Sequence, residues 1–184
     1  ASCTSYQVDR QLKDIESYIQ DRPDSALTVL EDIDRTTLRS KRNKAHHALL
    51  HAMALDKNYI NVTEDSLART ALEYFDRRGS MKYKARALYY LGLSKYYDQK
   101  YSDAIIFFTQ SEDVSRESLD SLYLAFSLVG QADVYNQIYN DLCQTFESYI
   151  SNDFNCILPL IKQHNVGDDI GAPVSLIRYN TSIA

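Results

Sequence analysis

The chain has 184 residues, a formal net charge of −5, five glycines and three prolines. This length is sufficient for one domain with a hydrophobic core, and so few Gly and Pro residues favour a helical chain. The negative charge argues against non-specific binding to nucleic acid, and no stretch approaches the roughly 20 apolar residues that a membrane-spanning helix needs.

The chain starts with Ala1, Ser2 and Cys3. This triplet is similar to the end of a bacterial lipobox, where small residues precede a cysteine that is lipidated after signal cleavage. Residues 1–5 are therefore predicted to be a linker that carries a lipid on Cys3. The alternative is a cysteine without a role in a flexible terminus.

Two short amphipathic helices are predicted next. Pro23 and Asp24 suit the first turn of the second of them. The apolar positions that recur at helical spacing are Val8, Leu12, Ile15 and Ile19 in the first helix, and Ala26, Leu30 and Ile33 in the second. The stretches KAHHALLHAMALDK and DSLARTALEYF predict a further pair of helices.

The segment ALYYLGLSKYYDQKYSDAIIFFTQS has the pattern of a tetratricopeptide repeat, which is a pair of antiparallel helices. Gly92 and Ala104 are small where the helices must approach closely, and Phe108 fills the gap between repeats. A weaker copy follows, in which Gly130 lies 38 positions after Gly92, somewhat beyond the usual period of about 34. In that copy Tyr139, Leu142 and Phe146 correspond to Tyr101, Ala104 and Phe108.

These patterns predict an all-α fold, a right-handed α-α superhelix of about four antiparallel helix pairs. The superhelix is expected to cover residues 6–158. Residues 159–184 contain turn residues without helical periodicity, and they are predicted to form an irregular tail.

The amino-acid sequence also resembles the N-terminal region of exported tetratricopeptide-repeat lipoproteins and sensor proteins of Bacteroidetes. The resemblance covers about residues 6–140 and implies the fold and export from the cytoplasm. The matching positions are 23–27, Ala45, Leu49, Leu50, 57–59, Thr63, 65–67, Tyr74, Ala85, Ala87 and 89–92.

In such a superhelix the first helix of each pair lines the concave face. The residues predicted on this groove are Arg86, Tyr89, Leu93, Tyr96, Ser127, Gln131 and Val134. Tyrosine offers a large rigid contact area with a polar tip. The Lys/Asn clamp that chaperone-binding relatives use for a terminal carboxylate is missing at these positions. The alternative for Tyr89 and Tyr96 is ordinary packing between helices.

Other candidate sites have simpler explanations. His47 and His51 lie four positions apart and could face one metal, but no glutamate accompanies them and a position on a helix flank explains them. The basic stretches RTTLRSKRNK and RRGSMKYKAR are either solvated turns or a patch for an anionic ligand. The Asp-Ser-apolar triplets at 24–26, 65–67 and 120–122 suit helix starts and also resemble the O-glycosylation signal of exported Bacteroidetes proteins.

The sequence thus predicts a non-enzymatic scaffold that binds a protein or peptide partner in its groove. No metal and no cofactor are expected, contact with a membrane is expected only through the lipid anchor, and the expected location is the cell envelope. The alternative is a module that senses a ligand or glycan.

Overall fold

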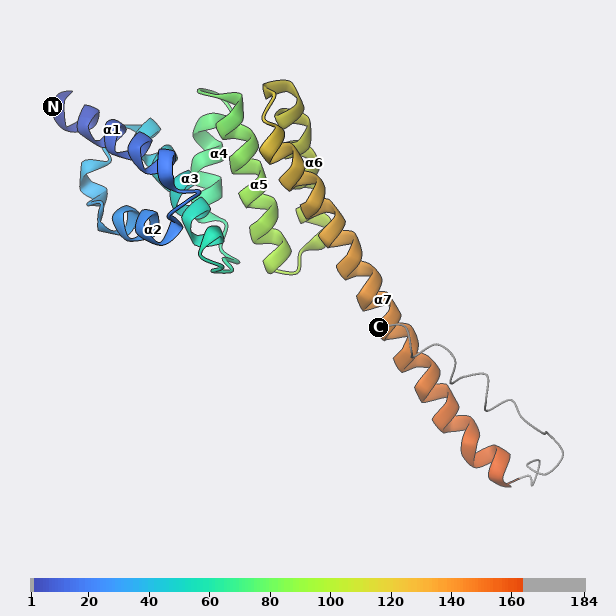
Figure 1. Ribbon diagram of the computed structural model, residues 1–184. Coiled ribbons are helices and arrows are strands. Elements are labelled where there is room, and N and C mark those ends of the chain that lie inside the picture. Colours follow the sequence, from blue (N-terminus) through green and yellow to red (C-terminus); the bar gives the residue numbers. More distant parts are fainter. Residues whose placement is uncertain (1, 164–184) are drawn as a thin grey trace. The chain divides into compact units, whose positions relative to one another are not determined.

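The computed structural model describes residues 2–163, and the side chains of residues 6–148. Seven α-helices hold 81% of the described residues, which include no strand, so the all-α prediction is confirmed (Figure 1). The helices, with one short 3₁₀ helix (η1), are α1 (Ser2–Tyr18), α2 (Pro23–Asp32), η1 (Arg35–Thr37), α3 (Lys41–Lys57), α4 (Ser66–Phe75), α5 (Met81–Tyr97), α6 (Tyr101–Ser118) and α7 (Ser121–Gln163).

The chain divides into two compact units, residues 1–138 and 139–184, and the boundary falls inside α7. The first unit contains α1 to α6 and the first part of α7. Helix α1 begins at Ser2, within the stretch expected to be a linker. Helix α7 ends at Gln163, so the first residues of the expected irregular tail are helical, and residues 164–184 lie outside the described part of the chain.

Within the first unit, consecutive helices pack as hairpins, namely α3 with α4 and α5 with α6, and the second helix of a hairpin also packs on the first helix of the next. Helix α3 contacts α1 and α5, whereas α2, α4 and α6 do not contact one another. The helices therefore form two rows. We call α1, α3, α5 and residues 121–138 of α7 the first row, and α2, α4 and α6 the second row.

The helix starts follow from local chemistry. Pro23 occupies the first turn of α2, where its missing N–H costs nothing. Ser40 caps α3 by accepting a hydrogen bond from the backbone N–H of Asn43. Asp65 and Asp120 directly precede α4 and α7, as the sequence predicted for a helix start. Between α6 and α7, Leu119 adopts a left-handed conformation that turns the chain.

Phe108 of α6 packs between two glycines of the first row. A Cβ atom added to Gly92 of α5 would lie 2.7 Å from the Phe108 ring, and one added to Gly130 of α7 would lie 2.8 Å from it. The ring itself is fully buried. The prediction that Gly92 lies where two helices approach closely, with Phe108 filling the gap, is confirmed.

The second helix of the last predicted pair does not form. Helix α7 continues without a turn through the positions where the chain was expected to reverse. Residues 131–158 contain neither Gly nor Pro, so nothing in the sequence ends the helix there. Tyr139, Leu142 and Phe146 are exposed and do not occupy the buried positions of Ala104 and Phe108.

Candidate binding face

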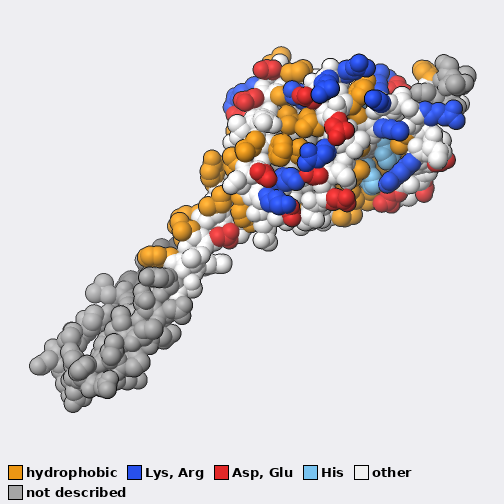
Figure 2. Space-filling view, turned by 180° about the vertical axis from the view of Figure 1, so that it is seen from behind, with side chains coloured by type: hydrophobic (Ala, Val, Ile, Leu, Met, Phe, Trp, Pro, Cys, Tyr) orange, Lys and Arg blue, Asp and Glu red, His pale blue; other side chains and the backbone are white. Residues whose placement is uncertain are grey.

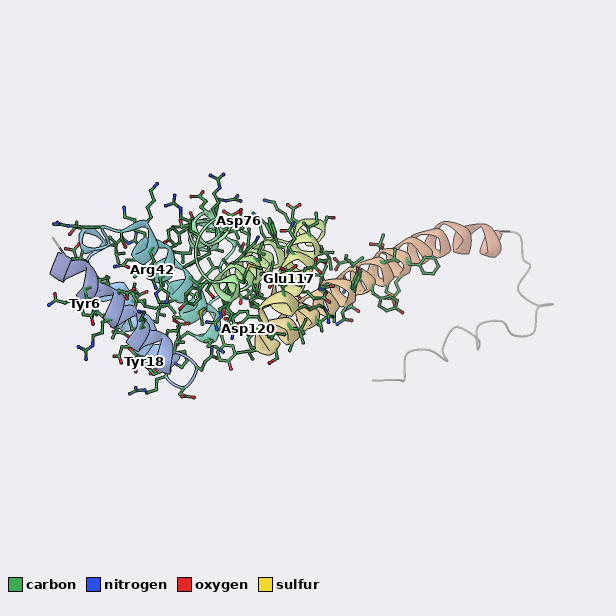
Figure 3. The ribbon with its side chains drawn as sticks, turned by 90° about the horizontal axis from the view of Figure 1, so that it is seen from above. Tyr6, Tyr18, Arg42, Asp76, Glu117 and Asp120 are labelled. Atoms are coloured by element: carbon green, nitrogen blue, oxygen red, sulfur yellow. The ribbon has the colours of Figure 1, made fainter. Side chains whose placement is uncertain are left out.

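Three helices of the first row meet around Arg86 of α5. One guanidinium nitrogen, Nη1, donates to Glu16 Oε1 of α1 at 2.9 Å, and Nε lies 3.4 Å from Asp120 Oδ2 at the start of α7. Figure 3 labels Asp120 at this helix start. The guanidinium carbon also lies 5.1 Å from the centre of the Tyr123 ring. Arg86 is only 19% exposed and Asp120 only 8%, so these charges depend on each other.

The second oxygen of Glu16 has partners in two more places. His46 Nε2 of α3 lies 3.1 Å from Oε2, and the Tyr83 hydroxyl of α5 donates to the same oxygen at 2.7 Å. Burial alone would raise the pKa of Glu16. The effect of burial is outweighed by hydrogen bonds from His46 and Tyr83 and by the charges of His46 and Arg86, so the pKa of Glu16 is lowered to about 2. We call these five residues, Glu16, His46, Tyr83, Arg86 and Asp120, the Arg86 network.

The low pKa of Glu16 makes stability depend on pH. The pKa is lower in the folded chain than in the unfolded one, so the stabilisation is present above the unfolded value near 4.5 and is lost as pH falls toward 2. We expect the wild-type advantage over Glu16→Gln in free energy of unfolding to shrink between about pH 5 and pH 2. Urea unfolding of both proteins across this range measures the difference, and a constant difference would show that Glu16 titrates normally.

Aromatic rings surround Tyr89 next to this network. The centre of the Tyr89 ring lies 5.1 Å from that of Tyr90 and 5.7 Å from that of Phe108. It also lies 5.6 Å from the Tyr123 ring and 5.7 Å from the Phe126 ring, both of α7. These separations fall within the range of favourable aromatic pairs, about 4.5–7 Å. The Tyr89 cluster, formed by these five rings, therefore joins α5, α6 and α7.

The far end of the first row combines tyrosines with carboxylates. Tyr96 lies 5.7 Å, centre to centre, from Tyr97. Burial raises the pKa of Tyr97, and the charges of Asp56 in α3 and Asp133 in α7 raise it further. Burial also raises the pKa of Asp56, against the opposing charge of Lys57. The Asp56 carboxylate forms no hydrogen bond or ion pair within the described part of the chain.

This arrangement suits a ligand with aromatic or basic side chains. Half-buried rings offer apolar contact, and a cation is attracted both by ring faces and by carboxylates that lack a partner. Lys57 Nζ, 5.8 Å from the centre of the Phe126 ring, already shows that an ammonium group can lie over a ring here. We call the surface formed by Asp56, Lys57, Leu93, Tyr96, Tyr97, Phe126 and Asp133 the tyrosine face.

The predicted groove residues fall into two groups. Arg86, Tyr89, Leu93 and Tyr96 lie together along α5, half-buried. The three groove residues predicted on α7 face α6 instead. Ser127 is fully buried, and its hydroxyl oxygen lies 2.7 Å from Tyr123 O and 2.8 Å from Ser111 Oγ of α6. Val134 is also fully buried, and Gln131 donates to Glu112 of α6 at 2.7 Å.

The error on α7 is one of register. Matching Gly130 to Gly92 placed Ser127 where Tyr89 lies, although Phe126, one residue earlier, contacts the Tyr89 ring. Counting from Phe126 at helical spacing would have reached Asp133. Asp56 and Lys57 were also missed, because they lie at the C-terminal end of α3 and belong to no repeat motif. The available signal was the combination of charged and aromatic residues at the C-terminal ends of α3 and α5.

Two of the three described histidines have hydrogen-bond partners within the protein. His46 belongs to the Arg86 network, and His47 Nε2 lies 2.9 Å from Leu30 O of α2. His51 Nδ1 is buried without a hydrogen-bond partner, and burial lowers the pKa of this side chain. Among the described residues, no group of three or more His, Cys, Asp or Glu side chains could hold a metal ion.

One of the three cysteines has a described side chain. Cys143 is a free thiol. The side chains of Cys3 and Cys156 lie outside the described part of the chain, so the predicted lipidation of Cys3 remains a prediction.

Within residues 2–163, no helix is long and apolar enough to cross a bilayer. No protein-family model, curated protein or solved structure matches the chain.

Proposed function

We propose that this chain is a scaffold of the tetratricopeptide type, a right-handed α-α superhelix that binds a peptide segment of a protein partner and catalyses no reaction. The two rows of helices support this proposal, because each second-row helix packs between two first-row helices, as repeat architectures require. The contacts of Gly92 and Gly130 with Phe108 support the repeat spacing. The first row would then line the concave side.

The observation that carries the binding proposal is the tyrosine face. Leu93, Tyr96 and Tyr97 are half-buried, so each leaves part of its side chain available for contact. Asp56 is half-buried and lacks a partner among the described side chains, so a cationic or hydrogen-bond-donating group of the ligand would satisfy it. The Arg86 network, by contrast, is internally paired and suits a structural role. A partner segment with aromatic and basic residues fits these features best.

A photo-crosslinking amino acid placed at Leu93 tests this proposal. Leu93 lies on the tyrosine face, whereas Ile106 is 52% exposed on the second-row helix α6 and serves as a matched control position. In cells of the natural host we expect one discrete crosslinked partner from position 93 and none of the same mass from position 106. The same partner from both positions, or none from position 93, would contradict binding at the tyrosine face.

The partner identified in this way allows a quantitative prediction. Tyr96→Ala should weaken binding by about 1–2 kcal/mol, the size expected when an aromatic anchor is truncated. Tyr96 is half-buried and lies 5.9 Å, centre to centre, from Tyr101, so a modest fall in melting temperature is expected beside the loss of affinity. Isothermal titration calorimetry and thermal melting of the same samples check both parts. Normal binding by a folded Tyr96→Ala protein would show that the partner does not contact Tyr96.

We also propose that the protein is exported and anchored in the cell envelope by a lipid on Cys3, supported by the sequence Ala1-Ser2-Cys3 and by the family resemblance. Expressed from its full gene in its natural host, the wild-type protein should partition into detergent, and Cys3→Ala should release it into the aqueous phase. Mass spectrometry of the N-terminal peptide identifies the acyl group. Wild-type protein without acyl mass would contradict the anchor.

A further inference from the structure

Two basic segments that lie far apart in the sequence meet at one end of the first unit. Lys41 and Arg42 begin α3, and Arg77 and Arg78 follow Asp76, the residue at the C-terminal cap of α4. All four line one hollow of about 450 Å³ between these elements. Figure 3 looks onto this end and labels Arg42 and Asp76, beside which long nitrogen-tipped side chains project. Figure 2 shows several Lys and Arg side chains along the upper edge, with Asp and Glu side chains among them.

These cations lack the carboxylate partners that neighbouring cations have. Lys41, Arg77 and Arg78 form no ion pair within the described part of the chain, and Arg42 lies 3.9 Å from Asp9, at the limit of an ion pair. Close by, in contrast, Lys84 pairs with Asp76 at 2.8 Å. In a chain of net charge −5, a hollow with several unpaired cations is an unusual concentration of positive charge.

We infer that this hollow binds a phosphate group, carried by a small molecule or by a lipid headgroup. Two adjacent guanidinium groups can each donate paired hydrogen bonds to phosphate oxygens, and Lys41 adds a point charge from the opposite side. The Ser40 hydroxyl, which also lines the hollow, accepts the capping hydrogen bond of α3 from Asn43 and can still donate its own proton to a phosphate oxygen. Glu73 is the single carboxylate in the lining, and it leaves the cations in excess.

A purely structural role for the two arginines makes a different prediction. Arg77 and Arg78 follow the C-terminal end of α4, where positive charge favours the helix dipole. In that case their removal would lower stability and leave the affinity for anions unchanged. Removing Lys41 and Arg42, which begin a helix instead of ending one, separates the two roles.

Pyrophosphate serves as a soluble probe. Its binding to the full chain is monitored by two-dimensional NMR at constant ionic strength. Two variants remove hollow cations, Arg77→Gln/Arg78→Gln and Lys41→Gln/Arg42→Gln. Arg10→Gln/Arg22→Gln, at exposed positions away from the hollow, is the control with the same change in charge. We expect amide shifts confined to residues near 40–44 and 73–78. Each hollow variant should lose about tenfold or more in affinity, the size of one charge-assisted hydrogen bond, and the control less than about twofold.

Vesicles separate the two sources of phosphate. Binding to phosphatidylcholine vesicles that contain phosphatidylglycerol, but not to phosphatidylcholine alone, with loss in both hollow variants, would assign a lipid headgroup. Binding of pyrophosphate without vesicle binding would assign a free phosphate compound. Equal losses in the hollow variants and the control, shifts spread over all exposed basic residues, or no binding of either probe would overturn the inference.

Discussion

Arg86→Ala is expected to lower the free energy of unfolding by about 3 kcal/mol, because removing one member of a buried charge network leaves its partners uncompensated. Arg86 holds Glu16 of α1 at 2.9 Å and Asp120, at the start of α7, at 3.4 Å. Without the guanidinium, two carboxylates with little access to solvent lose their common counter-ion. Urea unfolding at pH 7, followed by circular dichroism, measures the loss.

Arg116→Ala is the matched control. Arg116 pairs with Glu112 at 2.7 Å, but its side chain is 56% exposed and both residues lie on one helix. An exposed pair of this kind contributes about 0–1 kcal/mol. The two substitutions remove the same chemical group and differ in burial and in the number of helices joined. Equal effects would mean that the Arg86 network is solvated and does not tie α1, α5 and α7 together.

The sequence predicted the packing of α5 and α6 because that packing depends on local pattern. Gly92, Ala104 and Phe108 lie at fixed spacings within one hairpin, and the periodicity of small and large residues determines which side chains meet. The Arg86 network could not be predicted in this way. Glu16 and Arg86 are 70 positions apart, and their contact depends on how three hairpins stack.

The last predicted hairpin failed for a related reason. The repeat pattern was read from a spacing of small and aromatic residues, but a helix ends only where a residue ends it. After Gly130 the sequence offers no such residue until Pro159. The basic hollow depends instead on the closure of a single hairpin, since Lys41 begins α3, Arg77 follows α4, and the packing of these two helices brings both residues to one hollow.

Gly92→Leu is expected to lower the free energy of unfolding by about 1–3 kcal/mol through overpacking against Phe108. Even a Cβ atom at this position would lie 2.7 Å from the ring, and the ring cannot retreat toward α7 because Gly130 approaches it from that side. Leucine favours a helix by nearly 1 kcal/mol relative to glycine, which offsets only part of this cost. Thermal and urea unfolding measure the net change.

Ala125→Leu on α7 is the control, because Ala125 is exposed and an added side chain there meets solvent. This substitution should change the free energy of unfolding by less than about 0.5 kcal/mol. A double-mutant cycle then identifies the cause at Gly92. If the Phe108 ring is the obstacle, Gly92→Leu should cost markedly less in a Phe108→Ala background, because the removed ring leaves room for the leucine. The same cost in both backgrounds would mean that α5 and α6 do not meet around Phe108, and the repeat packing proposed for this chain would then be wrong.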